Sequence, residues 1–202
     1  MTRIISGNAK GRALKVPDRD TRPTSDRVKE SLFSALEHRY GGFTGLNVLD
    51  LFAGSGALGL EAASRGARDV LLVERAPTAC AVIRENIKSS RLTQVRLAAM
   101  DVTQWVQSAA AKSSQGWDVV FVDPPYDLPE VDIVNVLAAL ISQSALAPEC
   151  EVLVERRKSR GGPPMFAWPE GLEQVDLRTY GDTVVFHAVC YGQLPDDESV
   201  AE

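Results

Sequence analysis

Three kinds of residue on which many functional sites depend are scarce in this sequence. Its 202 residues include only two histidines, His38 and His187, aromatic residues make up 6 %, and there are three cysteines, Cys80, Cys150 and Cys190. An odd, scattered set of cysteines forms neither a disulfide framework nor a zinc-binding spacing. The two histidines suggest no catalytic base and no metal site. We therefore expect a protein of a reducing compartment, with no metal partner.

Long apolar segments are also missing. No apolar run approaches the roughly 18 residues of a membrane span, and no signal-peptide core follows the basic N-terminus. Hydrophobic residues make up 45 % and charged residues 24 %, which are ordinary values for a globular protein. A chain of this length fits one domain, or one domain with an appendage, and needs no disulfide or metal to fold. These features predict a cytoplasmic protein without a membrane partner.

Positive charge is concentrated at the N-terminus. The formal net charge is −5, but residues 1–30 hold eight lysines and arginines against four acids, so this segment is +4 and the remainder is −9. A basic segment on an acidic body predicts contact with an anionic partner, most commonly a phosphate backbone. The alternative is an ordinary solvated surface. A second basic cluster runs into Gly161–Pro164, a composition typical of a mobile loop: Arg156, Arg157, Lys158 and Arg160.

Strand and helix patterns alternate along the chain. The Gly7–Gly11 turn lies between apolar residues and predicts a short hairpin, and Pro23-Thr24 predicts the start of a helix. Short apolar strands then alternate with amphipathic helices: strands at 47–52, 70–74, 95–99, 119–122 and 152–154, and helices after Gly59, from Pro77, at 102–109 and at 134–141. A closing hairpin surrounds Tyr180–Asp182. This order predicts the α/β class, with a doubly wound, mostly parallel sheet.

A glycine-rich loop follows the first of these strands. Gly54–Gly59 matches the pattern G-x-G-x-x-G, and a helix rich in alanine and leucine begins at once. Glycines let the backbone turn tightly and approach a ligand at the helix N-terminus. Glu74 ends the next strand twenty residues after Gly54, where a carboxylate can accept hydrogen bonds from ribose hydroxyls. The order predicts a site for an adenosine-containing ligand; the alternative is a purely structural turn.

Acidic residues at two strand ends bear on the choice of ligand. Asp50 precedes Gly54 by four residues and would place negative charge where the pyrophosphate of a nicotinamide dinucleotide should lie. The ammonium or sulfonium of S-adenosylmethionine would be favoured there. The alternative role for Asp50 is to cap nearby backbone amides. Asp101 could reach an adenine amino group, or it could equally be the N-cap of the following helix.

The segment Asp123-Pro124-Pro125-Tyr126 follows the fourth buried strand, at the edge where open α/β sheets bind ligands. Prolines supply no N–H, so the Pro124 carbonyl can face a ligand instead of pairing in the sheet. That carbonyl and the Asp123 carboxylate are two acceptors for the two hydrogens of one exocyclic amine, which would hold its nitrogen for attack on a methyl group. Tyr126 can stack on a base that is splayed or flipped out. The alternative is a rigid turn.

These motifs together resemble the Rossmann-type S-adenosylmethionine-dependent amino-methyltransferases. Four N-terminal segments narrow the resemblance to the RsmD family of bacterial 16S ribosomal RNA guanine-N2 methyltransferases: Arg3-Ile-Ile-Ser-Gly7, Gly11-Arg12-x-Leu14, Arg22-Pro-Thr24 and Asp26–Phe33. The similarity runs from about Arg3 to Tyr191 in the family's order. One departure is Lys10, because the family pattern has arginine at this position. Lysine keeps the positive charge but lacks the guanidinium group that can donate two parallel hydrogen bonds.

The resemblance implies a class I methyltransferase fold, with a seven-stranded sheet of order 3-2-1-4-5-7-6 and an N-terminal β-hairpin extension. It implies methyl transfer from S-adenosyl-L-methionine to N2 of one guanine of 16S rRNA, within an assembled or nearly assembled small ribosomal subunit. We accordingly expect an RNA-binding arm at residues 1–22, the methyltransferase domain at 23–192, and an acidic, disordered tail at 193–202.

The resemblance also assigns residues to roles. Cofactor binding is expected of Asp50, Phe52, Ala53, Gly54, Ser55, Gly56, Glu74, Arg75, Asp101 and Val102. Catalysis is expected of Asp123, Pro124, Pro125 and Tyr126. RNA binding is expected of Arg3, Lys10, Arg12, Lys15, Arg19, Arg22, Thr24 and Arg27. Without the resemblance, Arg22 and Thr24 would form only a turn and a helix cap.

Other functions stay open at this point. The same Asp-Pro-Pro-Tyr chemistry serves N6 of adenine in DNA or RNA, although adenine-specific DNA enzymes usually carry a recognition domain for which 202 residues leave little room. Methylases of protein glutamine more often have asparagine in place of Asp123. A non-catalytic, nucleotide-binding RNA chaperone and an NAD-dependent reductase are the alternatives from other classes.

Overall fold

The computed structural model describes residues 2–17, 26–108, 115–158 and 165–191. Its strands are β1 (Thr2–Arg3), β2 (Ala13–Leu14), β3 (Asn47–Leu51), β4 (Asp69–Glu74), β5 (Val95–Ala99), β6 (Trp117–Val122), β7 (Leu146–Arg157), β8 (Leu172–Tyr180) and β9 (Thr183–Cys190). Its helices are α1 (Asp26–Tyr40), α2 (Ala57–Ser64), α3 (Pro77–Ser90), α4 (Val102–Val106) and α5 (Glu130–Ser142). Within these ranges, no helix is long and apolar enough to cross a membrane.

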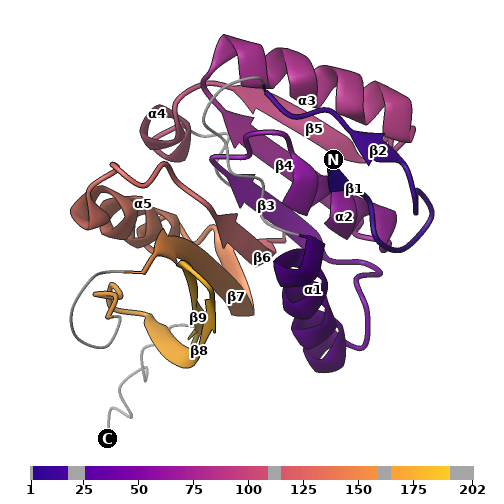
Figure 1. Ribbon diagram of the computed structural model, residues 1–202. Coiled ribbons are helices and arrows are strands. Elements are labelled where there is room, and N and C mark those ends of the chain that lie inside the picture. The colour runs from indigo at the N-terminus through magenta and orange to yellow at the C-terminus, as the bar shows by residue number, and fades with distance from the viewer. Residues whose placement is uncertain (1, 18–25, 109–114, 159–164, 192–202) are drawn as a thin grey trace, which may run out of the picture.

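One seven-stranded sheet forms the centre of the protein (Figure 1). Its order is β5-β4-β3-β6-β7-β9-β8, and the first five strands pair in parallel while β9 pairs antiparallel with β7 and with β8. Numbered from β3, this order is 3-2-1-4-5-7-6, so the predicted α/β fold and strand order are confirmed. The order reverses between β3 and β6, and the carboxyl ends of such strands form the usual ligand crevice of open α/β sheets.

The central strands send alternate side chains to two hydrophobic cores. Val48 and Phe121 pack with apolar residues of α1, α2 and α3, whereas Leu49 and Val120 pack with those of α4 and α5. Because helices cover both faces, the central strands must be apolar nearly throughout, as the segment 119–122 is. Trp105 and Trp117 lie in the core on the α4 and α5 side of the sheet, and Trp168 packs against it.

Three elements differ most from their predicted positions. β7 starts at Leu146, six residues before the predicted strand, and it is irregular because Glu149 has a left-handed φ of 61°. Such an irregularity hides the alternation on which a strand prediction rests. α5 starts at Glu130 because its acidic first turn favours a helix N-terminus without adding to the apolar face, and α4 ends at Val106. The predicted helix start at Pro23-Thr24, the 161–164 loop and the acidic tail lie outside the described residues.

The described part of the predicted arm, the N-terminal hairpin at residues 2–17, is packed against the domain, and it is called the arm from here on. β1 and β2 form their own antiparallel pair. Turn amides of the arm donate to the Ser64 carbonyl at 2.7 Å and to the Ser64 hydroxyl at 2.9 Å. A Cβ on Gly7, whose φ is 79°, would lie 1.8 Å from that carbonyl oxygen, so only glycine allows this approach. The turn of the arm is therefore fixed on the end of α2.

A buried ionic cluster holds the start of the arm. The fully buried Glu61 carboxylate accepts the Ile5 amide at 2.7 Å and the Ser6 amide at 3.0 Å, and it pairs with Arg65 at 2.8 Å. The buried Lys29 ammonium lies 3.8 Å from Glu61 and donates to the Arg3 carbonyl at 2.6 Å. Burial lowers the pKa of Lys29, and the charges of Glu61 and Asp26 oppose that change.

Glu61→Ala is expected to destabilise the protein strongly. It removes the Glu61 carboxylate from the buried Lys29 ammonium and from two partly buried amides. Removing one partner of a buried ion pair costs about 3–5 kcal/mol. Urea unfolding measures this loss. Glu85→Ala is the matched control, since it removes an arm contact of the exposed Lys15 and should leave the free energy of unfolding unchanged. Equal stability of Glu61→Ala and the native protein would contradict this account of arm docking.

Candidate active site

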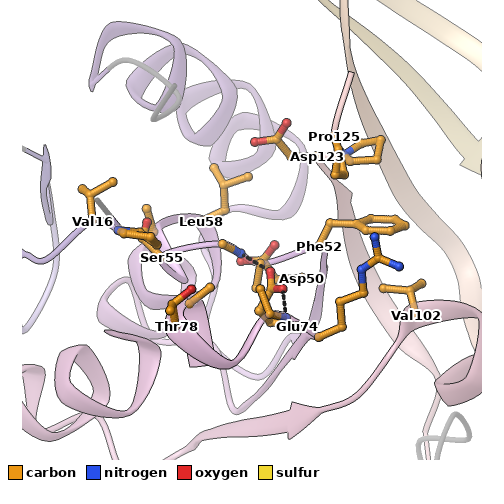
Figure 2. A pocket seen from close by; sticks show the side chains of 18 of the residues that line it. Val16, Asp50, Phe52, Ser55, Leu58, Glu74, Thr78, Val102, Asp123 and Pro125 are labelled. Carbon is orange, nitrogen blue, oxygen red and sulfur yellow. Dashed lines mark hydrogen bonds between the residues drawn. The ribbon is translucent and has the colours of Figure 1, made fainter. Parts of the chain in front are cut away.

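A cleft of about 620 Å³ opens at the carboxyl ends of β3, β4 and β6. Figure 2 shows residues from these strands, from α3 and from the arm converging on it. The lining includes Val16, Pro17, Asp50, Phe52, Ala53, Gly54, Ser55, Ala57, Leu58, Glu74, Arg75, Ala76, Thr78, Ala79, Val102 and Asp123–Asp127. The glycine loop, the end of β4 and the Asp-Pro-Pro-Tyr segment therefore share one cavity, large enough for a cofactor-sized ligand.

The glycine loop turns through left-handed backbone conformations. Phe52, Gly54 and Gly56 have φ of 61°, 57° and 75°, and Gly56 is the N-cap of α2. Glycine adopts this region freely, whereas Phe52 is strained there. Gly59 is constrained by packing, because a Cβ would lie 2.2 Å from the Leu72 side chain and 3.2 Å from the Asp50 carboxylate. The glycines thus let the loop reach the cleft and let α2 approach the sheet.

The Glu74 carboxylate is fixed at the edge of the cleft by two backbone amides. One oxygen accepts from Gly54 at 2.9 Å and the other from Ala76 at 2.7 Å. A carboxylate oxygen has a second acceptor position, so each can also accept a hydroxyl of a ligand. A carboxylate held in this way could accept two neighbouring hydroxyls, as in a ribose.

Asp50 is buried beneath the glycine loop and also borders the cleft. One carboxylate oxygen accepts the Gly59 amide at 2.9 Å, and the residue is 1 % exposed. Burial raises the pKa of Asp50 to about 7, the Gly59 amide opposes that rise, and the nearby Glu74 charge adds to it. Asp50 therefore caps a backbone amide and also lines the cavity, and its contact with the cofactor stays a prediction.

The Asp-Pro-Pro-Tyr segment forms another wall of the cleft. In Figure 2, Asp123 and Pro125 lie on the side of the cavity opposite Glu74 and Thr78. The Asp123 amide donates to the Leu51 carbonyl at 3.4 Å, which ties the segment to β3. Pro124 is buried, and Tyr126 is 42 % exposed at the rim. An exposed aromatic ring beside a carboxylate is suited to receive a flat, amine-bearing ring from solvent.

Most of the predicted cofactor residues meet in the cleft. Its lining leaves out two of them, Gly56 and Asp101. Gly56 acts as the helix cap described above. Asp101 is the N-cap of α4, accepting the Thr103 amide at 2.9 Å, and it pairs with Arg75 at 3.2 Å. The N-cap interpretation of Asp101 therefore applies, and its contact with an adenine stays a prediction.

The predicted RNA-binding residues fall into three groups: on the arm, outside the described residues, and in α1. Four lie on the described arm: Arg3, Lys10, Arg12 and Lys15, all exposed. Arg12 donates to the Ser89 carbonyl and Lys15 to Glu85 at 2.6 Å, so these chains lie along α3. Arg19, Arg22 and Thr24 lie outside the described residues, and Arg27 lies in the first turn of α1.

Sequence reasoning missed the arm's part in the cleft. Val16 and Pro17 line it, as do Thr78 and Ala79 in the first turn of α3. Pro77, three residues after the strand end at Glu74, did indicate the helix residues, because proline at the first helical position places a helix N-terminus near Glu74. Nothing in the local pattern of Val16-Pro17 indicated a tertiary contact. His187 lies on β9, 2.6 Å from Glu151 and outside the cleft lining, in agreement with a structural role.

The sheet order and the glycine loop define the class: the fold is that of the Rossmann-like S-adenosylmethionine-dependent methyltransferases. The sequence profile of the family described as "Conserved hypothetical protein 95" matches residues 2–188. The chain belongs to this family, which confirms the resemblance to the RsmD family seen in its motifs.

Named relatives agree with this assignment. Ribosomal RNA small subunit methyltransferase D of Escherichia coli K12 is 35 % identical over 175 residues, 86 % of this chain and 84 % of that protein. YlbH of Bacillus subtilis is 43 % identical over 125 residues, 61 % of this chain, and the match spans only 66 % of YlbH. The solved structure of yhhF from Escherichia coli has a TM-score of 0.78 at 30 % identity and covers 95 % of this chain and 98 % of that one.

Proposed function

We propose that this protein transfers a methyl group from S-adenosylmethionine to the exocyclic N2 of one guanine in 16S rRNA. The observation that carries the proposal is the single cleft in which Asp123–Tyr126 faces the glycine loop, Asp50 and Glu74. A relative of similar length is named a small-subunit ribosomal RNA methyltransferase. The guanine, its N2 atom and the subunit as partner are parts of the proposal.

The residues of the cleft fit S-adenosylmethionine better than a dinucleotide. Asp50 and Glu74 make one side of the cavity acidic, which favours a cationic ligand and opposes a pyrophosphate. Glu74 would accept the ribose hydroxyls through the acceptor positions that Gly54 and Ala76 leave open. Asp50 would face the amino-acid end of the cofactor, directly or through water. When bound, the cofactor supplies an electrophilic methyl group on its sulfonium sulfur.

The Asp-Pro-Pro-Tyr segment would hold the accepting amine. An aromatic amine is a poor nucleophile because its lone pair is delocalised into the ring. The Asp123 carboxylate and the Pro124 carbonyl would each accept one of its hydrogens, favour a pyramidal nitrogen and direct its lone pair at the methyl carbon. Transfer would form the nitrogen–carbon bond and break the carbon–sulfur bond, whose electron pair would stay on sulfur. Asp123 can accept the proton from the resulting cationic nitrogen, and Tyr126 would stack on the extruded base.

The arm would supply the contact with the phosphate backbone. A triple variant, Lys10→Ala with Arg12→Ala and Lys15→Ala, is expected to weaken binding to small subunits and to reduce the slope of log K against log salt by about 2–3, since each lost phosphate contact removes about 0.7–0.9. Affinity for S-adenosylhomocysteine should not change. Filter binding at several salt concentrations and calorimetry measure the two affinities.

Arg91→Ala with Arg96→Ala and Arg178→Ala is the charge-matched control, because these exposed residues lie on other elements. It should retain the native salt slope. An equal loss in both triple variants, or an equal loss of RNA and cofactor affinity in the arm variant, would show that the arm is not the phosphate contact.

Methyl incorporation tests the proposed reaction. The protein is incubated with tritiated S-adenosylmethionine and, in parallel, with unmodified small subunits, naked 16S rRNA, transfer RNA or duplex DNA. We expect label in small-subunit RNA and none in DNA. Label in DNA alone would contradict the assignment of rRNA as the substrate. If the protein binds the cofactor but labels none of the substrates, a non-catalytic binding protein would be favoured.

A further inference from the structure

One buried amide side chain joins the arm to the glycine loop. Asn86 lies on the inner side of α3 and is 1 % exposed. Its amide nitrogen donates to the Lys15 carbonyl at 3.0 Å and to the Ser55 carbonyl at 2.9 Å. Its amide oxygen accepts the Lys15 N–H at 2.9 Å. Both donors and the acceptor of this side chain are therefore used, and every partner is backbone of another segment.

Both of those partners border the cleft. Ser55 lines it, and Lys15 directly precedes Val16 and Pro17, which line it as well (Figure 2). The Lys15 side chain itself points to Glu85 on the surface of α3 and carries one of the charges assigned to RNA contact. Asn86 thus fixes two walls of the cleft relative to each other, and one of those walls is the end of the basic arm.

The other contacts of the arm lie farther from the cleft along the chain. Glu61 and Ser64 hold residues 5–9, and Lys29 holds the Arg3 carbonyl. Arg12 donates to the Ser89 carbonyl, and Leu14 is buried in the core. These contacts keep the hairpin docked whether or not the chain after Leu14 is aligned with the cleft. At residue 15, the buried contact is Asn86, supplemented by the exposed Lys15–Glu85 pair. Loss of Asn86 should therefore release the cleft end of the arm and leave the rest docked.

We propose that Asn86 is a positioning residue that couples cofactor binding in the cleft to substrate binding on the arm. A cofactor that orders the Ser55 loop orders the Lys15 backbone through the same side chain, so the arm loses less conformational freedom when the polyanion binds. By linkage, each ligand then raises the affinity for the other by the same factor. This inference rests on the proposed function, because it requires both a cofactor in the cleft and an RNA partner on the arm.

The test measures the coupling factor itself. The dissociation constant for small subunits is determined by filter binding with and without saturating S-adenosylhomocysteine, for the native protein and for Asn86→Ala. We expect the native protein to bind subunits about fivefold more tightly, or better, with the cofactor product present. In Asn86→Ala the ratio of the dissociation constants without and with S-adenosylhomocysteine should fall to about one. The variant should still bind subunits and S-adenosylhomocysteine separately with measurable affinity.

Asn47→Ala is the matched control. Asn47 is also a buried asparagine, 3 % exposed, and it bonds to the Gly116 carbonyl and to Arg68 at the amino end of β3, the end opposite the cleft. A merely structural loss of a buried amide should leave its coupling ratio at the native value. The proposal would be overturned if S-adenosylhomocysteine did not change the subunit affinity of the native protein. It would also be overturned if Asn86→Ala showed the same change as the native protein.

Hydrogen exchange on the native protein keeps the inference testable if Asn86→Ala does not fold. Saturating S-adenosylhomocysteine should slow exchange of the Lys15 and Val16 amides severalfold while leaving the Arg3 amide, at the far end of the arm, unchanged. Unchanged exchange at Lys15 and Val16 with the ligand bound would overturn the proposal. Failure of the ligand to bind at all would instead contradict the proposed function, so the two failures are distinguishable.

Discussion

Asp123→Ala is expected to reduce kcat by about 10²–10³-fold, the usual effect of removing one preorganised hydrogen-bonding group from a reacting centre. The affinity for S-adenosylmethionine should change little, because the residues proposed to bind it, Asp50 and Glu74, lie on other strands. The reason for the loss is geometric. The Pro124 carbonyl alone would accept one of the two amine hydrogens, and the nitrogen would no longer be held with its lone pair toward the methyl group.

Single-turnover methyl transfer and calorimetry with S-adenosylhomocysteine separate these two effects. Asp132→Ala is the control, since Asp132 is an exposed acid in the first turn of α5. It should retain native turnover. Full activity of Asp123→Ala would remove the Asp-Pro-Pro-Tyr segment from the chemistry, and a parallel loss of cofactor affinity would make Asp123 a binding residue instead.

Asp50→Asn is expected to stabilise the unliganded protein at neutral and alkaline pH while weakening cofactor binding. The asparagine can still accept the Gly59 amide, but it carries no charge to bury. The pKa of Asp50 is raised from 3.8 to about 7, mainly by burial. A pKa difference of one between the folded and unfolded states corresponds to about 1.4 kcal/mol, so the penalty for a buried charged Asp50 is about 4 kcal/mol.

The sign of the pH dependence follows from the raised pKa. Below the unfolded value of 3.8, Asp50 is protonated in both states and carries no penalty. As pH rises toward 7 the folded state holds a proton that the unfolded state has lost, so native stability declines relative to Asp50→Asn, by about 1.4 kcal/mol for each pH unit, and levels off above 7. Denaturant unfolding of both proteins at pH 5, 6, 7 and 8 measures this difference. A difference independent of pH would contradict the raised pKa.

Cofactor affinity should follow the opposite trend. A cationic ligand favours the charged form of Asp50, so the affinity of the native protein for S-adenosylmethionine should rise as pH increases through about 7. Asp50→Asn should bind the cofactor more weakly and lose that rise. These results together would show that the charge of Asp50 destabilises the unliganded protein and strengthens cofactor binding.

The part of the site that lies at the ends of strands could be predicted from local sequence patterns. The glycine loop and Asp123–Tyr126 follow apolar strands, and Glu74 is the last residue of one. Parallel strands bring their carboxyl ends to one edge of the sheet. The order of the strands could not be predicted in this way, because the residues of a strand do not indicate which strands lie beside it. The predicted order came from the family resemblance. The irregular start of β7 at Leu146 was hidden by the left-handed Glu149.

Contacts between distant segments could not be predicted from the sequence. Asn86 lies on the inner side of a helix, where an asparagine can be solvated, structural or a ligand contact, and only the fold reveals Lys15 and Ser55 as its partners. The same holds for Lys29 and Glu61, which have the pattern of surface charges on amphipathic helices but are both buried. Such residues are recognisable only when their partners are known.

The most direct test of the central claim is to identify the methylated atom. Unmodified small subunits are incubated with the protein and isotopically labelled S-adenosylmethionine, the RNA is digested to nucleosides, and the label is located by mass spectrometry. The proposed chemistry predicts one labelled N2-methylguanosine per subunit, and labelling at least about a hundredfold slower with Asp123→Ala. Labelled N6-methyladenosine in its place would contradict the assignment of guanine as the substrate.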